Sequence, residues 1–350
     1  MSANTHLLEL QASPHLHKKT SVNRIMYHVI YALLPVCAHS VWQFGWSALG
    51  LLATCVAVCM ATERFFNYMA GKPSTLSDGS AIITGLLLAL TLPPGFPLWM
   101  AAIGSAISIA LGKALFGGIG FNVFNPALVG RAFLQASFPV AITTWSPAFA
   151  KNRFAEFIPS SLTAPFHTPP SIDAWAQSVA VDGFSGATPL SLMKFSHTDT
   201  NVWHLLLGMT AGSAGETCAL LLMASGAYLM LRKFMDWRIP AAVLGSAFIV
   251  SGGLYLYSPS LYPGPFFMLF SGGLMLGALF MATDTVGSPV TPLGVWLYGA
   301  LIGSLTIIIR VKGGLPEGVM YAILLGNALT PLIDQWTQPR IFGQRKASHV

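Results

Sequence analysis

Residues 79–112, GSAIITGLLLALTLPPGFPLWMAAIGSAISIALG, decide which fold this chain can adopt. The stretch contains no charged residue, and Pro93-Pro94 divides it into two apolar runs. A helix that crosses a lipid bilayer needs about 20 apolar residues, but the first run ends after about 14. Short apolar runs of this kind are typical of broken or re-entrant helices. The stretch therefore predicts a membrane domain in which some helices do not cross completely.

The composition extends this prediction to the whole chain of 350 residues. Hydrophobic residues make up 54% and charged residues 9%, and the mean hydropathy is +0.64, whereas soluble domains carry roughly 25% charged residues. Apolar runs recur from residue 25 to residue 335, with one long polar interruption at 139–201. We therefore expect an all-α integral membrane protein without a soluble domain large enough to be an enzyme by itself. No cleavage-type sequence follows a short apolar core at the start, so no removable signal peptide is expected.

The apolar runs predict about ten transmembrane helices. Two look short for a full span, because Pro93-Pro94 closes the third and Asn125-Pro126 and Pro139 bound the fifth. The helices are expected near residues 25–40, 42–62, 79–92, 97–114, 123–138, 212–231, 239–257, 265–283, 292–310 and 316–335.

Lysine and arginine residues are distributed unequally between the two sides of these helices. With the N-terminus inside, the inner segments hold 13 of them and the outer segments hold 5, and basic residues gather on the cytoplasmic side of membrane proteins. We therefore expect 1–24 and 336–350 in the cytoplasm and the loop 139–211 on the outer side. Arg310 and Lys312 fit this count poorly, because both fall in an outer loop.

Several classes of function receive no support. The net charge of +6 does not indicate nucleic-acid binding, because the basic residues form short clusters at the ends of apolar runs. The four cysteines lie within apolar runs and form no CxxC pair, so neither disulfides nor an iron–sulfur cluster are expected in this chain. Metal-ligand spacings, a Ser/His/Asp arrangement and a phosphate-binding glycine loop are all missing from the sequence. Neither a metal site nor hydrolytic chemistry is predicted.

The two halves of the chain share an ordered series of features. Residues 79–132 and 272–331 each begin with a Gly-started apolar run that ends in a Pro-rich turn. An Ile-Gly-Ser triplet, a lysine, a Gly-Gly pair and an asparagine follow in the same order, at 103–105, Lys113, 117–118 and Asn125 and again at 302–304, Lys312, 313–314 and Asn327.

This similarity predicts two inverted five-helix repeats, 25–138 and 212–335. Five helices per half is an odd number, so the second copy must be inverted in the membrane. Inverted repeats with short or broken helices at matching positions are typical of transporters and channels, with a pathway near the repeat interface. The alternative is a chance likeness between Gly- and Pro-rich membrane segments.

Ionisable residues in or near the predicted helices are few, and a charge within lipid is costly and usually functional. Most lie close to a helix end, where a cap or a side chain that reaches the interface is the ordinary explanation. Asp78 is placed to cap the third helix, and Asp284 follows the eighth run at a related position of the repeat. Either aspartate is a candidate for an ion path. The full set is His28, His39, Glu63, Asp78, Lys113, Arg131, His204, Glu216, Asp284 and Asp334.

Residues 182–190, DGFSGATPL, form the most informative short motif, and they lie in the outer loop. Gly183 and Gly186 permit positive φ, and Pro189 pushes Thr188 into an extended backbone. The motif therefore predicts a tight turn that presents the Thr188 hydroxyl to solvent or to a modifying enzyme.

Asp182 together with Ser185-Gly186-Ala187-Thr188 matches the D-x-x-[ST]-G-A-T signature at which a flavin transferase esterifies FMN, through its phosphate, to the threonine. Residues 77–80 (SDGS), 117–133 (GGIGFNVFNPALVGRAF) and 282–284 (ATD) resemble the membrane signatures of the NqrB/RnfD family. The resemblance covers nearly the whole chain, in the right order. Its members are subunits of the sodium-pumping NADH:quinone reductase (NqrB) and of the ion-translocating Rnf electron-transport complex (RnfD, also called RsxD).

Within this family the chain is more similar to the RnfD branch. Only about 24 residues precede the first predicted helix, whereas NqrB-like chains carry a longer N-terminal extension. The resemblance then implies a complex that passes electrons between reduced ferredoxin and NAD and couples this flow to Na⁺ or H⁺ movement across the bacterial inner membrane. This chain would be a redox subunit of the translocase, not catalytic alone.

The resemblance also implies cofactors and partners. FMN would be attached covalently to Thr188, and Asp182, Ser185, Gly186 and Ala187 would serve recognition by the transferase from the periplasm. The other subunits of the Rnf complex, which are the A, B, C, E and G subunits, would be its partners and would supply iron–sulfur centres. A second, noncovalent flavin such as riboflavin is implied in this chain, and we expect it where the broken helices of the two halves meet.

Three alternatives remain open from the sequence. The chain could be an NqrB-like subunit, a non-redox channel or transporter with the same inverted repeats, or a structural assembly subunit. Thr188 separates the redox readings from the others, because only a flavoprotein would carry a covalent flavin there.

Overall fold

Helices form every regular element that the structure describes. The structure is a computed structural model, and it describes residues 21–339 except 173–174, 177, 179–187, 199, 217, 260 and 315. Within these residues there are 14 α-helices and no β-strand. The helices are α1 (Val22–Phe44), α2 (Trp46–Met69), α3 (Ser80–Thr91), α4 (Leu98–Gly112), α5 (Pro126–Ser137), α6 (Pro139–Ile142), α8 (Pro189–Ser196), α9 (Val202–Leu207), α10 (Ala219–Leu231), α11 (Arg238–Tyr257), α12 (Pro265–Phe270), α13 (Leu274–Leu276), α14 (Pro292–Lys312) and α15 (Val319–Thr337).

Five of these helices are long and apolar enough to cross a membrane. They are α1, α2, α4 with the turn that follows it, α11 and α14, and α3 and α10 are shorter apolar helices. The chain is therefore a multi-pass membrane protein, as its composition predicts.

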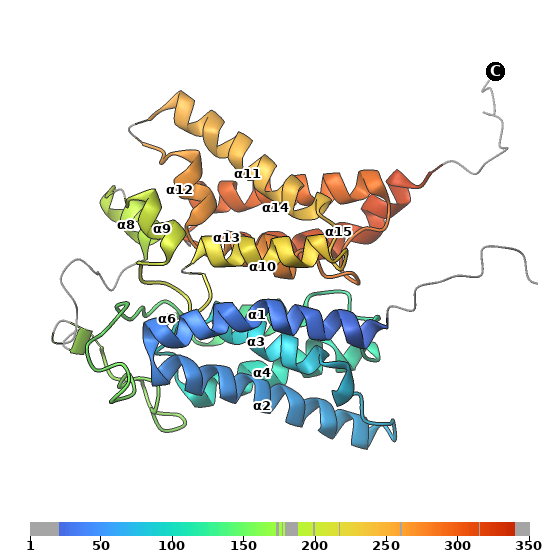
Figure 1. The fold of residues 1–350 in the computed structure, drawn as a ribbon, viewed down its shortest axis with the longest axis horizontal. Helices are drawn as coiled ribbons and strands as arrows, with labels where there is room; N and C mark the ends of the chain where they lie inside the picture. Colours follow the sequence, from blue (N-terminus) through green and yellow to red (C-terminus); the bar gives the residue numbers. More distant parts are fainter. Residues whose placement is uncertain are drawn as a thin grey trace, which may run out of the picture.

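The long helices are arranged in two groups that lie side by side (Figure 1). The first group contains α1–α5, and the second contains α10–α15. Inside the first group α4 packs against both α2 and α5, and inside the second α14 packs against both α11 and α15. The groups meet where α1 contacts α10 and where α5 contacts α15.

Glycines allow the closest helix contacts in both groups. A Cβ atom at Gly130 of α5 would lie 2.7 Å from the Gly104 carbonyl oxygen of α4. A Cβ atom at Gly303 of α14 would clash with the Val243 carbonyl oxygen of α11. Small residues let the backbones of membrane helices approach in this way, which strengthens van der Waals packing where the hydrophobic effect between helices is weak.

Most predicted helices lie where they were expected, and the third and fifth are short as predicted. Helices α3 and α5 contain 12 residues each. The sixth helix was predicted too long, because α10 begins only at Ala219. The backbone N–H groups of Ala214 and Gly215 instead donate to the carbonyls of Leu92 and Leu90, so the segment before α10 satisfies the end of α3.

The prediction of one continuous eighth helix over 265–283 is wrong. Helix α12 ends at Phe270, and α13 begins at Leu274 and continues as a π-helical turn over Gly277–Met281. The break contains Gly272 with φ +63°, a left-handed conformation that favours glycine. A Cβ atom there would lie 2.5 Å from Leu190 Cδ1, so the break also makes room for α8.

Both ends of the described chain lie at one end of the molecule, and the segment that connects the two helix groups lies at the other end. In Figure 1 the start of α1 and the end of α15 are on one side, and α6, α8 and α9 are on the other. Helices α8 and α9 belong to the segment that joins the two groups. This arrangement positions Thr188 far from both ends of the described chain.

Candidate functional site

Thr188 stands directly before α8 as its N-cap residue. Its backbone is extended, with φ −70° and ψ 150°, as Pro189 predicts. Its hydroxyl oxygen accepts a hydrogen bond from the Ser191 N–H at 3.2 Å and lies 2.8 Å from the Ser191 hydroxyl. The prediction that this hydroxyl faces solvent is wrong, because Thr188 is only 4% exposed.

Helix α8 is fastened to the second group through Lys194 and Leu190. Lys194 Nζ donates to the carbonyl oxygens of Arg310 at 3.0 Å and Gly313 at 2.5 Å, at the end of α14. Leu190 is buried against Gly272 in the break after α12. Burial lowers the pKa of the Lys194 ammonium group below its ordinary value. The helix that Thr188 caps is thus connected to both α14 and the broken helix.

The other residues of the motif that predicts flavin attachment precede Thr188 in the chain. Asp182, Ser185, Gly186 and Ala187 lie outside the described residues. Their role in recognition by a flavin transferase stays a prediction.

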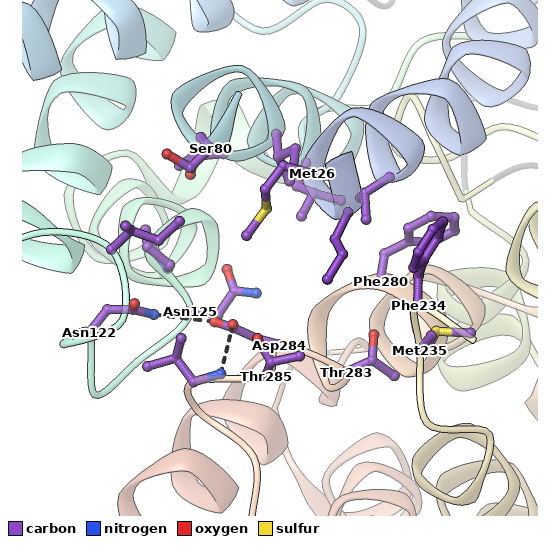
Figure 2. Close-up of a pocket in the computed structure, with 18 of the residues that line it drawn as sticks. Met26, Ser80, Asn122, Asn125, Phe234, Met235, Phe280, Thr283, Asp284 and Thr285 are labelled. Atoms are coloured by element: carbon purple, nitrogen blue, oxygen red, sulfur yellow. Dashed lines mark hydrogen bonds between the residues drawn. The ribbon is translucent and has the colours of Figure 1, made fainter. Parts of the chain in front are cut away.

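A second candidate site is a cavity between the two helix groups, called the central cavity below (Figure 2). Its walls come from α1, α3, the segment 113–126, the start of the segment after α10, and residues 279–286. Met26, Phe234 and Phe280 form apolar parts of the wall. The polar parts come from Asp284, two asparagines, Lys113 and several hydroxyl groups, among them Ser80. Both helix groups contribute residues to this cavity.

Asp284 is held at the wall of the central cavity by two hydrogen bonds. Its Oδ2 accepts from Asn122 Nδ2 at 3.2 Å, and its Oδ1 accepts from the Val286 N–H at 3.2 Å (Figure 2). Asn122 belongs to the first group and Asp284 to the second, so this contact crosses the interface. Asn122 is a site residue that the sequence did not single out, although it lies in the family-like stretch 117–133.

Asn125 and Asn327, which hold matching places in the two similar stretches of sequence, also meet at this interface. Asn125 caps α5 by accepting the Ala127 N–H, and its Nδ2 donates to the Met281 carbonyl at 3.2 Å. The Asn327 side-chain amide lies 3.1 Å from the Asn125 N–H and 2.7 Å from the Tyr298 hydroxyl. Amide side chains therefore join α5, α15 and the π-helical turn.

Asp78 does not line the central cavity but binds Ser80, which does. Its Oδ1 accepts from the Ser80 N–H at 2.8 Å and from the Ser80 hydroxyl at 2.5 Å, at the start of α3. The N-cap residue of α3 is Gly79 and not Asp78, so the capping prediction is one residue off. Ser80 lines the cavity (Figure 2). Asp78 therefore orients a cavity residue from outside, whereas Asp284 itself lines the wall.

Lys113 and Glu63 form a buried ion pair beside Ser80. Lys113 Nζ lies 2.8 Å from Glu63 Oε1 and donates to Ser80 Oγ at 2.5 Å. The two side chains are 6% and 4% exposed, so the expectation that residues near helix ends reach toward the interface is wrong for both. A buried charge needs a partner, but the two residues are 50 positions apart, and no local pattern predicts their pairing.

These contacts define what the site can hold. The central cavity combines apolar and aromatic walls with a few amide, hydroxyl, carboxylate and ammonium groups, which is the usual lining of a small-molecule site. Among the described residues, no group of three or more His, Cys, Asp or Glu side chains is placed to hold a metal ion.

Known proteins with similar sequences cover nearly the whole chain. The D subunit of a proton-translocating ferredoxin:NAD(+) oxidoreductase complex from Clostridium ljungdahlii is 39% identical over 97% of this chain and 98% of its own length. D subunits of ion-translocating oxidoreductase complexes are 35% identical in Escherichia fergusonii, over 97% of this chain and 99% of their own, and 40% identical in Stutzerimonas stutzeri, over 93% of each. The family described as NQR2, RnfD, RnfE matches residues 9–343. The chain therefore belongs to the NQR2, RnfD, RnfE family.

Proposed function

We propose that this chain is the RnfD-type subunit of an ion-translocating ferredoxin:NAD oxidoreductase complex of the Rnf type. In this role it relays electrons through an FMN attached to Thr188 and contributes to the coupled movement of Na⁺ or H⁺. Relatives named as the D subunits of such complexes align with at least 93% of the chain, which supports the assignment. An NqrB-like subunit of a Na⁺-pumping NADH:quinone reductase is the second candidate, because the same family includes NQR2.

The position of Thr188 is the observation that carries the proposal. It ends the flavin-attachment motif and caps α8, a helix of eight residues. The N-terminal end of a helix favours a negative charge, so a phosphodiester at Thr188 would be stabilised there. The ester oxygen can still accept the Ser191 N–H, which keeps the helix capped. Because the Thr188 hydroxyl is buried, the transferase must act before α8 packs against α14, or at a time when α8 has separated from α14.

The wider path of electrons requires other carriers. An FMN at the outer surface receives electrons that start in the cytoplasm, so iron–sulfur centres in the partner subunits must take part. We place the proposed second, noncovalent flavin in the central cavity, because both helix groups line it and its walls suit an aromatic ring with a polar edge. Asp78 and Asp284 are proposed for the ion path beside it.

The proposed topology is ten crossings in two inverted halves, 25–138 and 212–335, in a bacterial inner membrane. Both termini are cytoplasmic, and the segment that carries Thr188 is periplasmic. The lining of the central cavity supports this, because 25–29, 113–126, 234–235 and 279–286 are all inner segments or lie next to one. Arg310 does not count against this topology, because its side chain is buried and donates to the Met268 and Ser271 carbonyls.

In-gel fluorescence tests the flavin proposal. The full chain is produced with its flavin transferase, and a denaturing gel is examined for flavin fluorescence. We expect a fluorescent band for the wild type, and no band for Thr188→Asn. Asparagine preserves the helix cap but has no hydroxyl to esterify, so loss of the flavin would not reflect loss of α8.

Thr168→Val is the matched control, because Thr168 is exposed in the same segment and also precedes a proline. This variant should stay fluorescent, as should Thr188→Ser, which keeps a hydroxyl. An unlabelled wild type in the presence of the transferase would contradict the redox role and favour a channel or an assembly subunit.

A further inference from the structure

Four charged side chains, three of them buried and Glu317 half-buried, surround the break after α12, and neither the flavin nor the central cavity uses them. We call Arg131, Glu216, Arg310 and Glu317 the Arg–Glu cluster. Arg131 comes from the first helix group, and the other three come from the second or from the segment before it. The cluster therefore bridges the interface, on the side of the central cavity that faces α8.

The two glutamates flank the break directly. A Cβ atom at Gly272 would lie 3.7 Å from Glu317 Oε1, and one at Gly273 would lie 3.6 Å from Glu216 Oε2. The two carboxyl groups therefore lie beside neighbouring residues of the break, and both line the same small cavity. Two carboxyl groups can share a hydrogen bond only when one of them carries a proton.

Glu216 is positioned by the backbone around it. Gly215 donates to the Leu90 carbonyl at the end of α3, and Glu216 Oε1 accepts from the Ser213 N–H at 2.8 Å. Glu216 is 7% exposed. These contacts hold a carboxyl group inside the protein interior, where an unpaired charge is costly.

The arginines balance the glutamates from two directions. Arg131 Nη2 lies 2.8 Å from Glu317 Oε2. Arg310 is 3% exposed and donates to the Met268 and Ser271 carbonyls at the end of α12. With both glutamates ionised, the four charges cancel; with one protonated, the cluster carries one positive charge.

A small cavity lies among these groups. It has a volume of about 20 Å³ and is lined by Arg131, Ser213, Glu216, Glu317 and the end of α3. Arg131 and Ser213 are buried, with 6% and 1% exposure. Their Nη1 and Oγ atoms make no hydrogen bond to the described residues. One water molecule needs about 10–15 Å³ and two to four polar partners, so the cavity suits a single water.

We propose that Glu216 and Glu317 form a proton-binding site, with one proton held between their carboxyl groups, on the ion route between the two halves. A metal cation fits this place poorly, because two guanidinium groups lie beside it and would repel it. Binding transfers one proton from water to a carboxylate oxygen, and release returns it to water. The role on the ion route rests on the proposed function in ion translocation, but the bound proton itself does not.

The charged and titratable groups around Glu216 and Glu317 influence whether the pair binds or releases the proton. The positive charges of Arg131 of α5 and Arg310 of α14 lie beside the pair, and the charge of Glu317 acts against ionisation of Glu216. Tyr321 of α15 interacts electrostatically with Arg131. Lys194 of α8 donates a hydrogen bond to the Arg310 carbonyl. The end of α3 and the Gly272-Gly273 break contribute only neutral groups.

Infrared spectroscopy of the purified complex tests the bound proton. The carbonyl band of a protonated carboxyl group should be present in the wild type, shift in heavy water and disappear as the pH is raised. Glu216→Gln should remove this band, because its amide preserves the contact with Ser213 but cannot bind the proton. Glu156→Gln is the control, since Glu156 is exposed in the outer segment. An unchanged band in Glu216→Gln would overturn the proposal.

Membrane vesicles that contain the whole complex test the place on the ion route. With ferredoxin and NAD as electron carriers, Glu216→Gln should lose most of the proton movement per electron, while its covalent flavin content equals that of the wild type. Undiminished proton movement in Glu216→Gln would overturn the assignment. A wild type that shows the carboxyl band but carries no flavin would refute the proposed flavin relay and leave the proton site standing.

Discussion

Asp284 lies on the wall of the central cavity, where Asn122 and the Val286 N–H hold its carboxylate. If the second flavin occupies this cavity, Asp284→Ala removes a charged hydrogen-bond partner from its polar edge. A hydrogen bond to a charged group contributes about 1.5–3 kcal/mol, so we expect noncovalent flavin binding to weaken by about tenfold or more. The measurement is the noncovalent flavin released from the purified complex, with covalent FMN read on the same sample.

Asp236→Ala serves as the control for that experiment, because Asp236 is exposed in the segment after α10 and does not line the cavity. It should retain both flavins. An Asp284→Ala complex that also retains both would contradict the placement of the second flavin.

Single residues show how far the sequence could predict the site. Thr188 was singled out by a short motif, because the motif consists of its neighbours along the chain, and its role as a flavin anchor stays a prediction. The partners of Lys113 and Arg131 were not found, since Glu63 lies 50 positions away and Glu317 lies 186 positions away. Composition says that such buried charges need partners, but only the packing of the helices selects them.

Helix bounds could be predicted where the thickness of the bilayer determines them, but not where contacts with other segments of the chain determine them. Apolar length and proline positions predict α1, α2, α11 and α14 closely, since a span must reach across the bilayer. The start of α10 and the break after α12 depend on contacts with α3 and α8, which lie elsewhere in the sequence. An apolar run therefore indicates a helix but does not indicate where neighbouring segments interrupt it.

The break at Gly272 gives a prediction for the element that carries Thr188. Gly272→Ala puts a Cβ atom on a left-handed backbone and 2.5 Å from Leu190 Cδ1 of α8. The strained backbone costs about 1–2 kcal/mol and the crowding about 1–3 kcal/mol. We expect a lower thermal unfolding temperature of the purified protein and faster proteolysis around α8.

Gly253→Ala is the matched control within α11, because nothing lies within 4 Å of the added atom. Alanine is favoured over glycine inside helices, so this variant should unfold at the wild-type temperature or above it. Equal effects of the two substitutions would show that the break does not hold α8.

At the scale of the whole molecule, the Lys/Arg distribution predicts an orientation, and the fold relates the side of Thr188 to the side of the termini. Lys113, Arg131 and Arg310 are buried, and Lys113 and Arg131 are paired with glutamates, so they carry no weight in a count of exposed charges. Without them the count is 11 inner residues against 4 outer ones. The ends of the described chain and the helix that carries Thr188 lie at opposite ends of the molecule (Figure 1). A periplasmic Thr188 therefore requires cytoplasmic termini.

Cysteine labelling with a membrane-impermeant maleimide tests this orientation. Ser74→Cys, between α2 and α3, and Thr168→Cys, in the segment that joins the two groups, are exposed positions on opposite predicted sides. The native Cys37, Cys55 and Cys59 are buried, so they should react little. In intact cells with a permeable outer membrane, Thr168→Cys should be labelled and Ser74→Cys only after the inner membrane is opened. Because a charge-based orientation is a property of the whole chain, the reverse pattern would invert every loop at once and would move the proposed flavin to the cytoplasmic side.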